Sequence, residues 1–406
     1  MAWRNIWRNP RRTLLTIGAI AFASLLLVFM LSFQFGSYET MINSAVKIHT
    51  GHLQVQAAGY QDKQDIRRVV PDPAVIGKIL DEIPEVQAYT YRAQAFSLIS
   101  SEDRTQGIVV TGIDPAGEAE VSKLKALVRQ GQFLSPGDTN LALLGELLAR
   151  NLRVNPGAEL TVLGQGRDGS IAATIVGVKG IYRSGLDEFD RASIHLPLPT
   201  FQEVFAMRGG VHAVVIIGKS LAAIPFIKAQ LKARLAASNL NRSLTVLDWE
   251  ELMPGLRQGI EMDLISGIIF YFILILVVAF SILNTFLMAI FERTREFGVL
   301  MAIGTRPGRL TRLLLIESLS MTAIGISTGI LLGSLLTLYF QAQGIEFAGS
   351  SDLLSQYGIS GRMYPKLSLL SALSGPLAVL GITFLAALYP ALKIRRLRPV
   401  EAMSYA

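Results

Sequence analysis

The sequence of 406 residues contains no cysteine and only four histidines. The lack of cysteine excludes disulfide bonds and thiolate metal sites, and the histidines at positions 49, 52, 195 and 212 do not have the spacing of zinc ligands. Charged residues make up only 17% of the chain, which is less than in ordinary soluble proteins. We therefore expect neither a metal site nor thiol chemistry, and the low charge favours a membrane protein.

A complete phosphate-binding loop is also missing. Residues 211–235 pass from a strand-like run through Gly218, Lys219 and Ser220 to a helix-like run, as such loops do. The full motif G-x-x-x-x-G-K-[ST] needs an earlier glycine, because glycines let backbone N–H groups curl around phosphates. Ala213 occupies that position. The segment is therefore predicted to be a polar turn between a strand and a helix, and no cofactor is expected to bind this chain.

Four long apolar runs accompany the scarcity of charge. The first, at residues 13–33, has no charged side chain over 21 residues, and as a helix it is about 31 Å long, enough to cross the hydrocarbon core. The other three runs have similar length and composition. The sequence predicts four transmembrane helices, at residues 13–35, 263–291, 313–340 and 367–390.

Positive charge is concentrated beside the ends of these runs, where the chain has 13 basic but only four acidic side chains. Basic residues of short loops usually lie in the cytoplasm, so residues 1–12, as an amphipathic helix, 292–312 and 391–406 are predicted to be cytoplasmic. Residues 36–262, with 23 basic and 24 acidic side chains, and residues 341–366 are predicted to lie outside. The excess charge follows the membrane topology, so no nucleic-acid partner is expected.

The outside segment is predicted to be an α+β domain. A strand at residues 52–57, a helix that begins at Pro73 and a strand at 87–100 form one set, and a similar set occupies 211–247. Two strand–helix–strand sets can build a ferredoxin-like layer of helices on a sheet. Between them lies a β-rich insertion at residues 112–205.

The insertion is expected to contain one clear helix, near residues 140–151. Its polar stretch at residues 181–191 is predicted to be an exposed loop. The acidic residues of this stretch are of a type that binds calcium, but no glycine-containing ligand loop accompanies them. A solvated loop is therefore favoured for Asp187, Glu188 and Asp190.

The third apolar run contains glycines at positions 325, 329 and 333. The letters G-x-S-x-G also occur here, but a nucleophile needs a turn between a strand and a helix. In a membrane helix, small residues four apart form one face for close packing, which is the favoured interpretation of Gly325, Gly329 and Gly333. Asn284 in the second run is expected to hydrogen-bond a neighbouring helix, which stabilises such pairs by about 0.6–2 kcal/mol.

The segment between the second and third runs has a different pattern. Phe297, Leu300, Met301 and Gly304 recur at the spacing of one helix face, and Arg306-Pro307-Gly308 then breaks the helix. One interpretation is a turn at the membrane surface. The alternative is an exposed apolar ridge on which a cytosolic partner docks.

Three motifs of the chain resemble one family. The stretch R-x-R-E-F-G-V-L-M-A-I-G at residues 293–304, the ending Y-P-A with R-R-L-R-P-V-E-A at 389–402, and the opening WRNIWRNPRRTLLTIGAI at 3–20 are similar to those of MacB/LolC/LolE/FtsX-type ABC transporter permeases, the mechanotransmission superfamily. The order of one span, a large outside domain and three further spans matches as well. HTGHLQVQAAGY at 49–60 and YRSGLDEFDR at 182–191 look nearest to the LolC/LolE lipoprotein-releasing branch.

The resemblance implies a multi-pass protein of the bacterial inner membrane with both termini in the cytoplasm. Its outside domain would consist of a porter-like part, at residues 48–111 and 206–255, and an inserted sabre-like part at 112–205. Residues 292–312 would form a coupling helix on a separate cytosolic ATPase. The residues carried over to ATPase coupling are Arg293, Arg295, Glu296, Phe297, Gly298, Leu300, Met301 and Gly304.

The implied partners are two copies of that ATPase, which uses ATP and magnesium, a second permease subunit of the same or a different sequence, membrane lipids, and a periplasmic chaperone or an outer-membrane partner. The chain is not expected to be an enzyme by itself. It would extract or release lipoproteins or lipids; export of peptides or drugs and signalling to a periplasmic hydrolase are the alternatives. A lipid-accepting cleft is expected at Leu27, Phe29, Met30, Phe33, Ile265, Ile268, Ile269 and Phe272.

Overall fold

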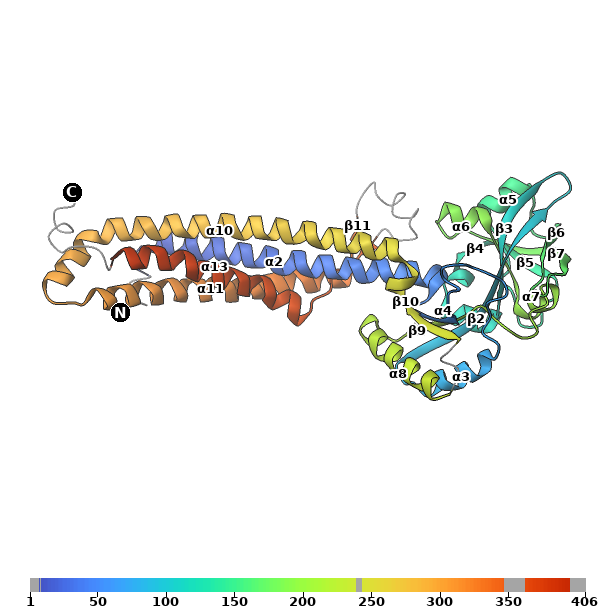
Figure 1. The fold of residues 1–406 in the computed structure, drawn as a ribbon. Coiled ribbons are helices and arrows are strands. Elements are labelled where there is room, and N and C mark those ends of the chain that lie inside the picture. Colours follow the sequence, from blue (N-terminus) through green and yellow to red (C-terminus); the bar gives the residue numbers. More distant parts are fainter. Residues whose placement is uncertain (1–6, 8, 239–242, 347–361, 395–406) are drawn as a thin grey trace. The chain divides into compact units, whose positions relative to one another are not determined.

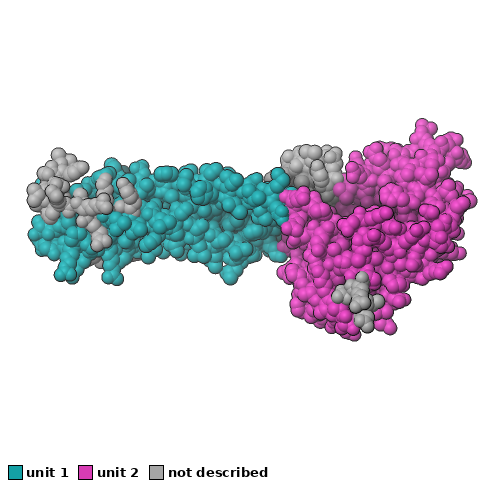
Figure 2. All heavy atoms as spheres, in the orientation of Figure 1, with its two compact units in different colours: residues 1–38, 259–346, 362–406 teal, residues 39–258, 347–361 magenta. Residues whose placement is uncertain are grey.

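The structure is a computed structural model of the whole chain, and it describes residue 7 and residues 9–238, 243–346 and 362–394. Most of the predicted amphipathic helix at residues 1–12, of the loop at 341–366 and of the tail at 391–406 therefore lies outside the described residues. The chain divides into two compact units, which Figure 2 colours separately. We call them the helix bundle (residues 1–38, 259–346 and 362–406) and the sheet domain (39–258 and 347–361).

The helix bundle contains the four helices that the apolar runs predicted (Figure 1). They are long and apolar enough to cross a membrane. Two of them exceed the predicted spans, because the first continues ten residues past residue 35 and the second begins nine residues before residue 263. Their bounds are α2 Pro10–Ala45, α10 Pro254–Ala302, α11 Pro307–Gln343 and α13 Leu369–Ile394.

Close contacts between helices in the bundle occur at glycines. A Cβ atom added to Gly325 would lie 2.8 Å from the Cβ of Ile20, and one added to Gly329 would lie 2.5 Å from the carbonyl oxygen of Ala21. Gly333 faces Val28 in the same way, at 3.0 Å. The three glycines thus form one face of α11 against α2, where the lack of side chains lets the two backbones approach.

The sheet domain is built on one sheet of ten strands in the described part of the chain. The strand order is β10-β1-β9-β2-β3-β8-β5-β7-β4, and β6 pairs with β2 and β7. The strands are β1 Leu53–Ala57, β2 Val86–Ser100, β3 Thr105–Ile113, β4 Val128–Gly131, β5 Leu141–Gly145, β6 Glu159–Gln165, β7 Ile171–Tyr182, β8 Ser193–Pro197, β9 Ala213–Gly218 and β10 Leu244–Asp248.

The first four strands in this order form the expected ferredoxin-like layer. Neighbours in β10-β1-β9-β2 are antiparallel, and α3 and α8 cover one face of the layer (Figure 1). Buried aliphatic side chains from both helices and from the strands make the core of this face. The helices and short turns of the sheet domain are α3 Pro73–Asp81, α4 Pro115–Val121, α5 Glu146–Leu152, α6 Asp187–Ala192, α7 Leu198–Val204, α8 Ile224–Ala237 and α9 Trp249–Leu252, with single turns at Val46–Thr50, Leu124–Leu127 and Leu221–Ala223.

The insertion continues the same sheet rather than forming a separate one. Strand β2 pairs with β9 up to Arg92 and with β3 from Arg92 to Ser100, so the expected boundary at residue 112 does not fall at a break in the sheet. Arg92 itself is buried and forms a bidentate ion pair with Glu118 of α4 at 2.6 and 2.8 Å. Desolvation raises the pKa of the Glu118 carboxyl, but the charge and hydrogen bonds of Arg92 outweigh it and hold the pKa below its ordinary value.

Two predictions for the insertion are wrong. The helix expected at residues 140–151 begins only at Glu146, because Leu141–Gly145 is a buried strand, and a short apolar run does not distinguish a strand from a buried helix. The stretch expected to be an exposed loop at 181–191 contains the end of β7 and all of α6 except its last residue. Asp190 is buried there and accepts hydrogen bonds from the backbone N–H of Ser184 at 2.9 and 3.1 Å.

Candidate functional site

The segment predicted to couple to an ATPase is a sharp turn between two helices rather than one helix over residues 292–312. Helix α10 ends at Ala302, Gly304 adopts a φ of 97°, and α11 starts at Pro307. The N–H of Gly304 donates to the carbonyl of Met301 (3.1 Å), and the N–H of Thr305 donates to that of Leu300 (2.9 Å). This pair of bonds is a Schellman motif, in which glycine takes the left-handed position that other residues adopt at a cost.

The inner side of the turn is packed with apolar side chains of the same chain. Phe297 is only 1% exposed and Met301 is also buried, and both contact a cluster formed by Ile290, Leu310 and Leu314. The expected exposed ridge is therefore wrong for these two residues, because their face of α10 is covered by the start of α11. Their predicted contact with an ATPase groove is not available in this arrangement.

Contacts of the charged side chain of Arg293 also stabilise this turn. The guanidinium of Arg293 lies 5.5 Å from the centre of the Phe297 ring, which is within cation–π distance. It also forms ion pairs of 3.4 Å with Glu296 and with Glu317 of α11. Glu296, expected to contact an ATPase, is thus partly engaged inside the chain.

The outer side of the turn carries an apolar tip. We use the name coupling tip for Val299, Leu300 and Ile303, which are exposed. Ile303 is the most exposed of them, at 74%. Arg295 is exposed next to the tip, whereas Gly298 is buried. Of the eight residues carried over from the family, Arg295, Leu300 and Gly304 are exposed, and their coupling role stays a prediction.

The residues of the expected lipid cleft do not converge. Leu27 is buried inside the bundle, and Phe29 packs against Phe340 of α11 with 5.8 Å between ring centres. The α10 members of the set point outward, with exposures of 56–65%. They are Ile265, Ile268, Ile269 and Phe272; of the remaining α2 members, Phe33 is half-buried and Met30 is exposed. Asn284 is exposed on α10 and has no hydrogen bond to another described helix of the chain.

A polar network between α2 and α10 was missed by the sequence analysis. The hydroxyl of Tyr38 donates to Asp263 at 2.5 Å, and the amide of Gln34 donates to the same carboxylate at 3.2 Å. The hydroxyl of Tyr271 donates to the Gln34 carbonyl at 2.9 Å. We call these four residues the outer latch. Polar side chains at the ends of apolar runs were its only signal, and nothing in the sequence paired them.

The sequence also did not indicate the role of His52. Its ring is buried; Nδ1 accepts from the N–H of Gly218 (3.2 Å), so Nε2 carries the proton and donates to Asn43 of α2 (3.1 Å). Its carbonyl accepts from the N–H of Trp249 (3.0 Å). Burial, aided by the charge of Lys47, lowers the pKa of His52 to about 4. One side chain thus joins the end of α2 to β9.

Comparisons with known proteins agree with this architecture. Residues 13–234 match the model of the MacB-like periplasmic core domain, and residues 268–399 match that of the FtsX-like permease C-terminal region. The lipoprotein-releasing system transmembrane protein LolC of Xylella fastidiosa (strain 9a5c) is 26% identical over 337 residues, which cover 79% of this chain and 78% of the relative.

A macrolide export ATP-binding/permease protein MacB of Shewanella sp. (strain W3-18-1) is 23% identical over 97% of this chain, which spans 58% of that relative. Among solved structures, the periplasmic region of MacB from Actinobacillus actinomycetemcomitans is 15% identical, with a TM-score of 0.39. The match covers 53% of this chain and 94% of the chain in that structure. Since the MacB-like model alone matches more than half of its residues, the chain belongs to the MacB-like periplasmic core domain family, as an ABC transporter permease of the LolC/LolE/MacB/FtsX type.

Proposed function

We propose that the chain is the membrane subunit of an ATP-driven transporter that passes the motion of a separate cytosolic ATPase to its outside domain. The similarity to LolC, which is named as a transmembrane protein of a system and aligns over 78% of its own length, supports a separate ATPase. The basic residues beside the spans support cytoplasmic termini and a cytoplasmic α10–α11 turn. Two ATPase copies, with ATP and magnesium, and a second permease subunit complete the proposed assembly.

The observation that carries this proposal is the continuity of α10. Its 49 residues form one helix from Pro254 to Ala302, about 74 Å at 1.5 Å per residue. The glycine-capped turn and the buried cluster around Phe297 fasten the end of α10 to the start of α11. A push on the turn would therefore be carried along α10 as one unbroken helix rather than being lost by unwinding at its end.

The coupling tip is the proposed contact for the ATPase. Exposed aliphatic side chains at a charged helix end suit a groove in a partner protein, and Val299, Leu300 and Ile303 are such side chains. Arg295 lies on the same exposed side and can pair with a carboxylate of the partner. Phe297 and Met301 support the tip from inside instead of entering the groove.

The proposed cargo is a lipoprotein or a lipid of the outer leaflet. LolC, whose name describes a lipoprotein-releasing system, aligns with this chain over most of both lengths. MacB, named for macrolide export, aligns over nearly all of this chain, and export of a drug or peptide from the periplasm is the second candidate. ATPase stimulation by an acylated protein, but not by its unacylated form, favours the first; stimulation by a macrolide favours the second.

The test of coupling replaces Ile303 in the chain purified with its native ATPase. Ile303→Asp should abolish co-purification of the ATPase and reduce cargo-stimulated ATP hydrolysis at least tenfold, because a carboxylate would have to enter an apolar groove. The thermal unfolding midpoint should not change, since the side chain is exposed.

Ile171→Asp is the matched control, because Ile171 is similarly exposed but lies in the sheet domain. It should leave ATPase binding and stimulated hydrolysis as in the wild type. Full co-purification and full stimulation in the Ile303→Asp protein would show that the tip is not the ATPase contact.

A further inference from the structure

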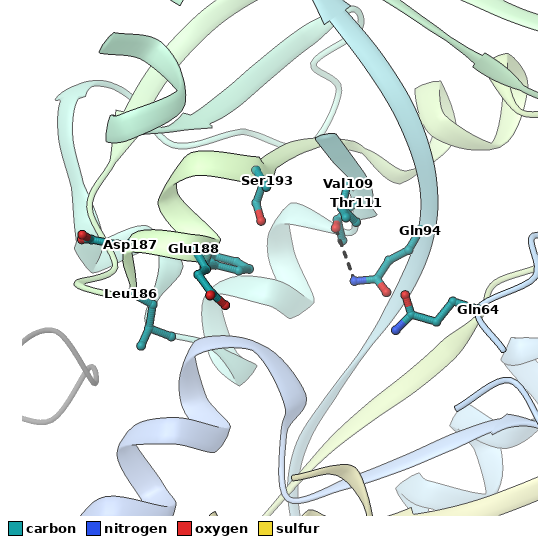
Figure 3. Close-up of a pocket in the computed structure, with 10 residues that line it drawn as sticks. Gln64, Gln94, Val109, Thr111, Leu186, Asp187, Glu188 and Ser193 are labelled. Carbon is teal, nitrogen blue, oxygen red and sulfur yellow. Dashed lines mark hydrogen bonds between the residues drawn. The ribbon is translucent and has the colours of Figure 1, made fainter. Parts of the chain in front are cut away.

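The sheet domain contains a pocket of about 860 Å³ that the proposed coupling does not use (Figure 3). Its floor is the sheet face of β2, β3 and β8, which presents Gln94, Val109, Thr111 and Ser193. In the pairing register Gln94 is opposite Thr111, and Val109 is opposite Ser193. Alternate residues of a strand share one face, so the register itself brings these four side chains together.

The walls of the pocket come from two other segments. One wall is α6 with the residue before it, and it contributes Leu186, Phe189 and Ala192 as apolar side chains. The facing side is Gln64, from the chain between β1 and α3. The pocket thus has an apolar wall and an amide-bearing wall above a mixed floor.

Polar groups that face the pocket are left with unused hydrogen-bonding capacity. Ser193 is only 6% exposed, and its hydroxyl, which has no hydrogen bond to any described residue, is available to a ligand in the pocket. The Gln64 amide also has no partner within the described chain. The amide of Gln94 makes one long bond, 3.5 Å to the hydroxyl of Thr111.

The charge of the pocket has one sign. Asp187 and Glu188 line it, are exposed, and form no ion pair with the described residues. No lysine, arginine or histidine belongs to the lining. In the first turn of α6, these carboxylates also stabilise the helix by interacting with its dipole. That interaction leaves most of their oxygen lone pairs free to accept hydrogen bonds from a ligand.

We propose that this pocket binds a protonated amine attached to an apolar group. The amine would pair with Glu188 and Asp187, the apolar group would lie on Leu186 and Phe189, and neighbouring polar groups would bond to Ser193 and Gln64. An anionic ligand would meet two uncompensated carboxylates. The volume lies within the range of about 300–1,000 Å³ that is usual for small-molecule sites. The amine can come from a small amphiphile or from a lysine side chain of a partner's peptide segment.

The experiment uses the full chain in lipid nanodiscs and saturation-transfer NMR, with empty nanodiscs as background. The small-molecule probes are phenethylamine and its neutral analogue 2-phenylethanol. The peptide probes are acetyl-Leu-Lys-Leu-amide and the same peptide with an acetylated lysine. Both charged probes should bind at least tenfold more tightly than their neutral analogues, and binding should weaken with added salt because exposed charges are screened.

The double variant Asp187→Asn with Glu188→Gln should remove this preference for charge, whereas Glu120→Gln, an exposed carboxylate outside the lining, should retain it. Gln64→Ala should weaken binding by a smaller factor of about three. Tighter binding of phenethylamine assigns the site to small amphiphiles, and tighter binding of the lysine peptide assigns it to a partner's segment. Equal binding of charged and neutral probes, or no binding of either charged probe by the wild type, would overturn the proposal.

Discussion

The helices α2 and α10 both pass from the sheet domain into the helix bundle, but they are held in different ways. About a third of the most apolar stretch of α2 is buried inside the chain, against 11% for α10. Helix α2 meets α11 backbone to backbone at Gly325, Gly329 and Gly333. Helix α10 meets α2 through side chains rather than backbone: its Ile275 and Ile282 share a buried apolar cluster with residues of α2. Polar contacts add to this, with the outer latch near one end and an ion pair of 2.7 Å between Arg12 and Glu292 near the other.

This difference indicates which helix can move. Close packing through glycine is lost with any displacement of the two backbones, because dispersion forces fall off within an ångström. Polar contacts between side chains can break and form again with water or headgroups at a modest free-energy cost. We therefore expect α2 to stay with α11 while α10 shifts, and each of the following predictions tests one side of this contrast.

The largest expected effect comes from placing a side chain between α2 and α11. In Gly329→Val, the new Cβ would lie 2.5 Å from the carbonyl oxygen of Ala21 and 2.5 Å from the Cβ of Ser24. Neither the backbone nor a short side chain can yield, so a loss of about 3 kcal/mol or more of stability is expected. The measurement is the thermal unfolding midpoint in detergent.

Gly381→Val is the matched control for this change. Gly381 lies in α13, and an added Cβ would meet nothing within 4 Å. Its midpoint should stay close to that of the wild type. A Gly329→Val protein as stable as the control would mean that α2 and α11 are not closely packed, and the contrast with α10 would disappear.

The next largest expected effect is the loss of stability when His52, which bonds Asn43 near the end of α2, becomes protonated. Burial lowers the pKa of His52 to about 4, and an unfolded histidine has a pKa of about 6.5. Acidification therefore protonates the unfolded chain first, and the stability contributed by neutral His52 is complete above pH 6.5 and falls as the pH drops towards 4. The expected loss is roughly 3 kcal/mol.

Unfolding of the sheet domain by urea, followed by circular dichroism at pH 7 and pH 4.5, measures this dependence. His52→Gln should be less stable at pH 7, since Gly218 loses its acceptor, and should lose less stability on acidification. His212, whose pKa burial also lowers to about 4, should account for a remaining part. An unchanged pH dependence in His52→Gln would show that His52 does not titrate in this range.

Length and composition predicted the four spans, since apolar runs of about 20 residues have few alternative structures. Their ends were not predictable in the same way, because the residues of α2 after position 35 are mixed in polarity, and Asn43 near its end is bonded by His52. Strand β5, at Leu141–Gly145, was mistaken for helix because both its faces are buried. In each case the deciding contacts lie outside the local sequence.

The candidate site shows the same limit. The 3.6-residue period placed Phe297 and Met301 on one face of α10, but a period does not tell whether that face meets solvent or the same chain. The partners Tyr38 and Asp263 are 225 positions apart, so no local motif links them. The break at residues 306–308 was predictable, because proline suits the first turn of a new helix. Gly304 was instead expected within a helix, and it adopts the left-handed position that ends α10.

The smallest expected effect comes from the outer latch. Tyr38→Phe removes the hydroxyl that donates to Asp263 at 2.5 Å but keeps the ring, so the cost should be about 1.5–3 kcal/mol, the value for a hydrogen bond to a charged group. Hydrogen exchange at residues 259–267 of α10 should become faster, while residues 325–333 of α11 stay protected. Tyr339→Phe, on the exposed side of α11, is the control and should change neither segment. If α11 loosened as much as α10, the two helices would be equally mobile, and α10 would have no special part in carrying motion between the two units of the chain.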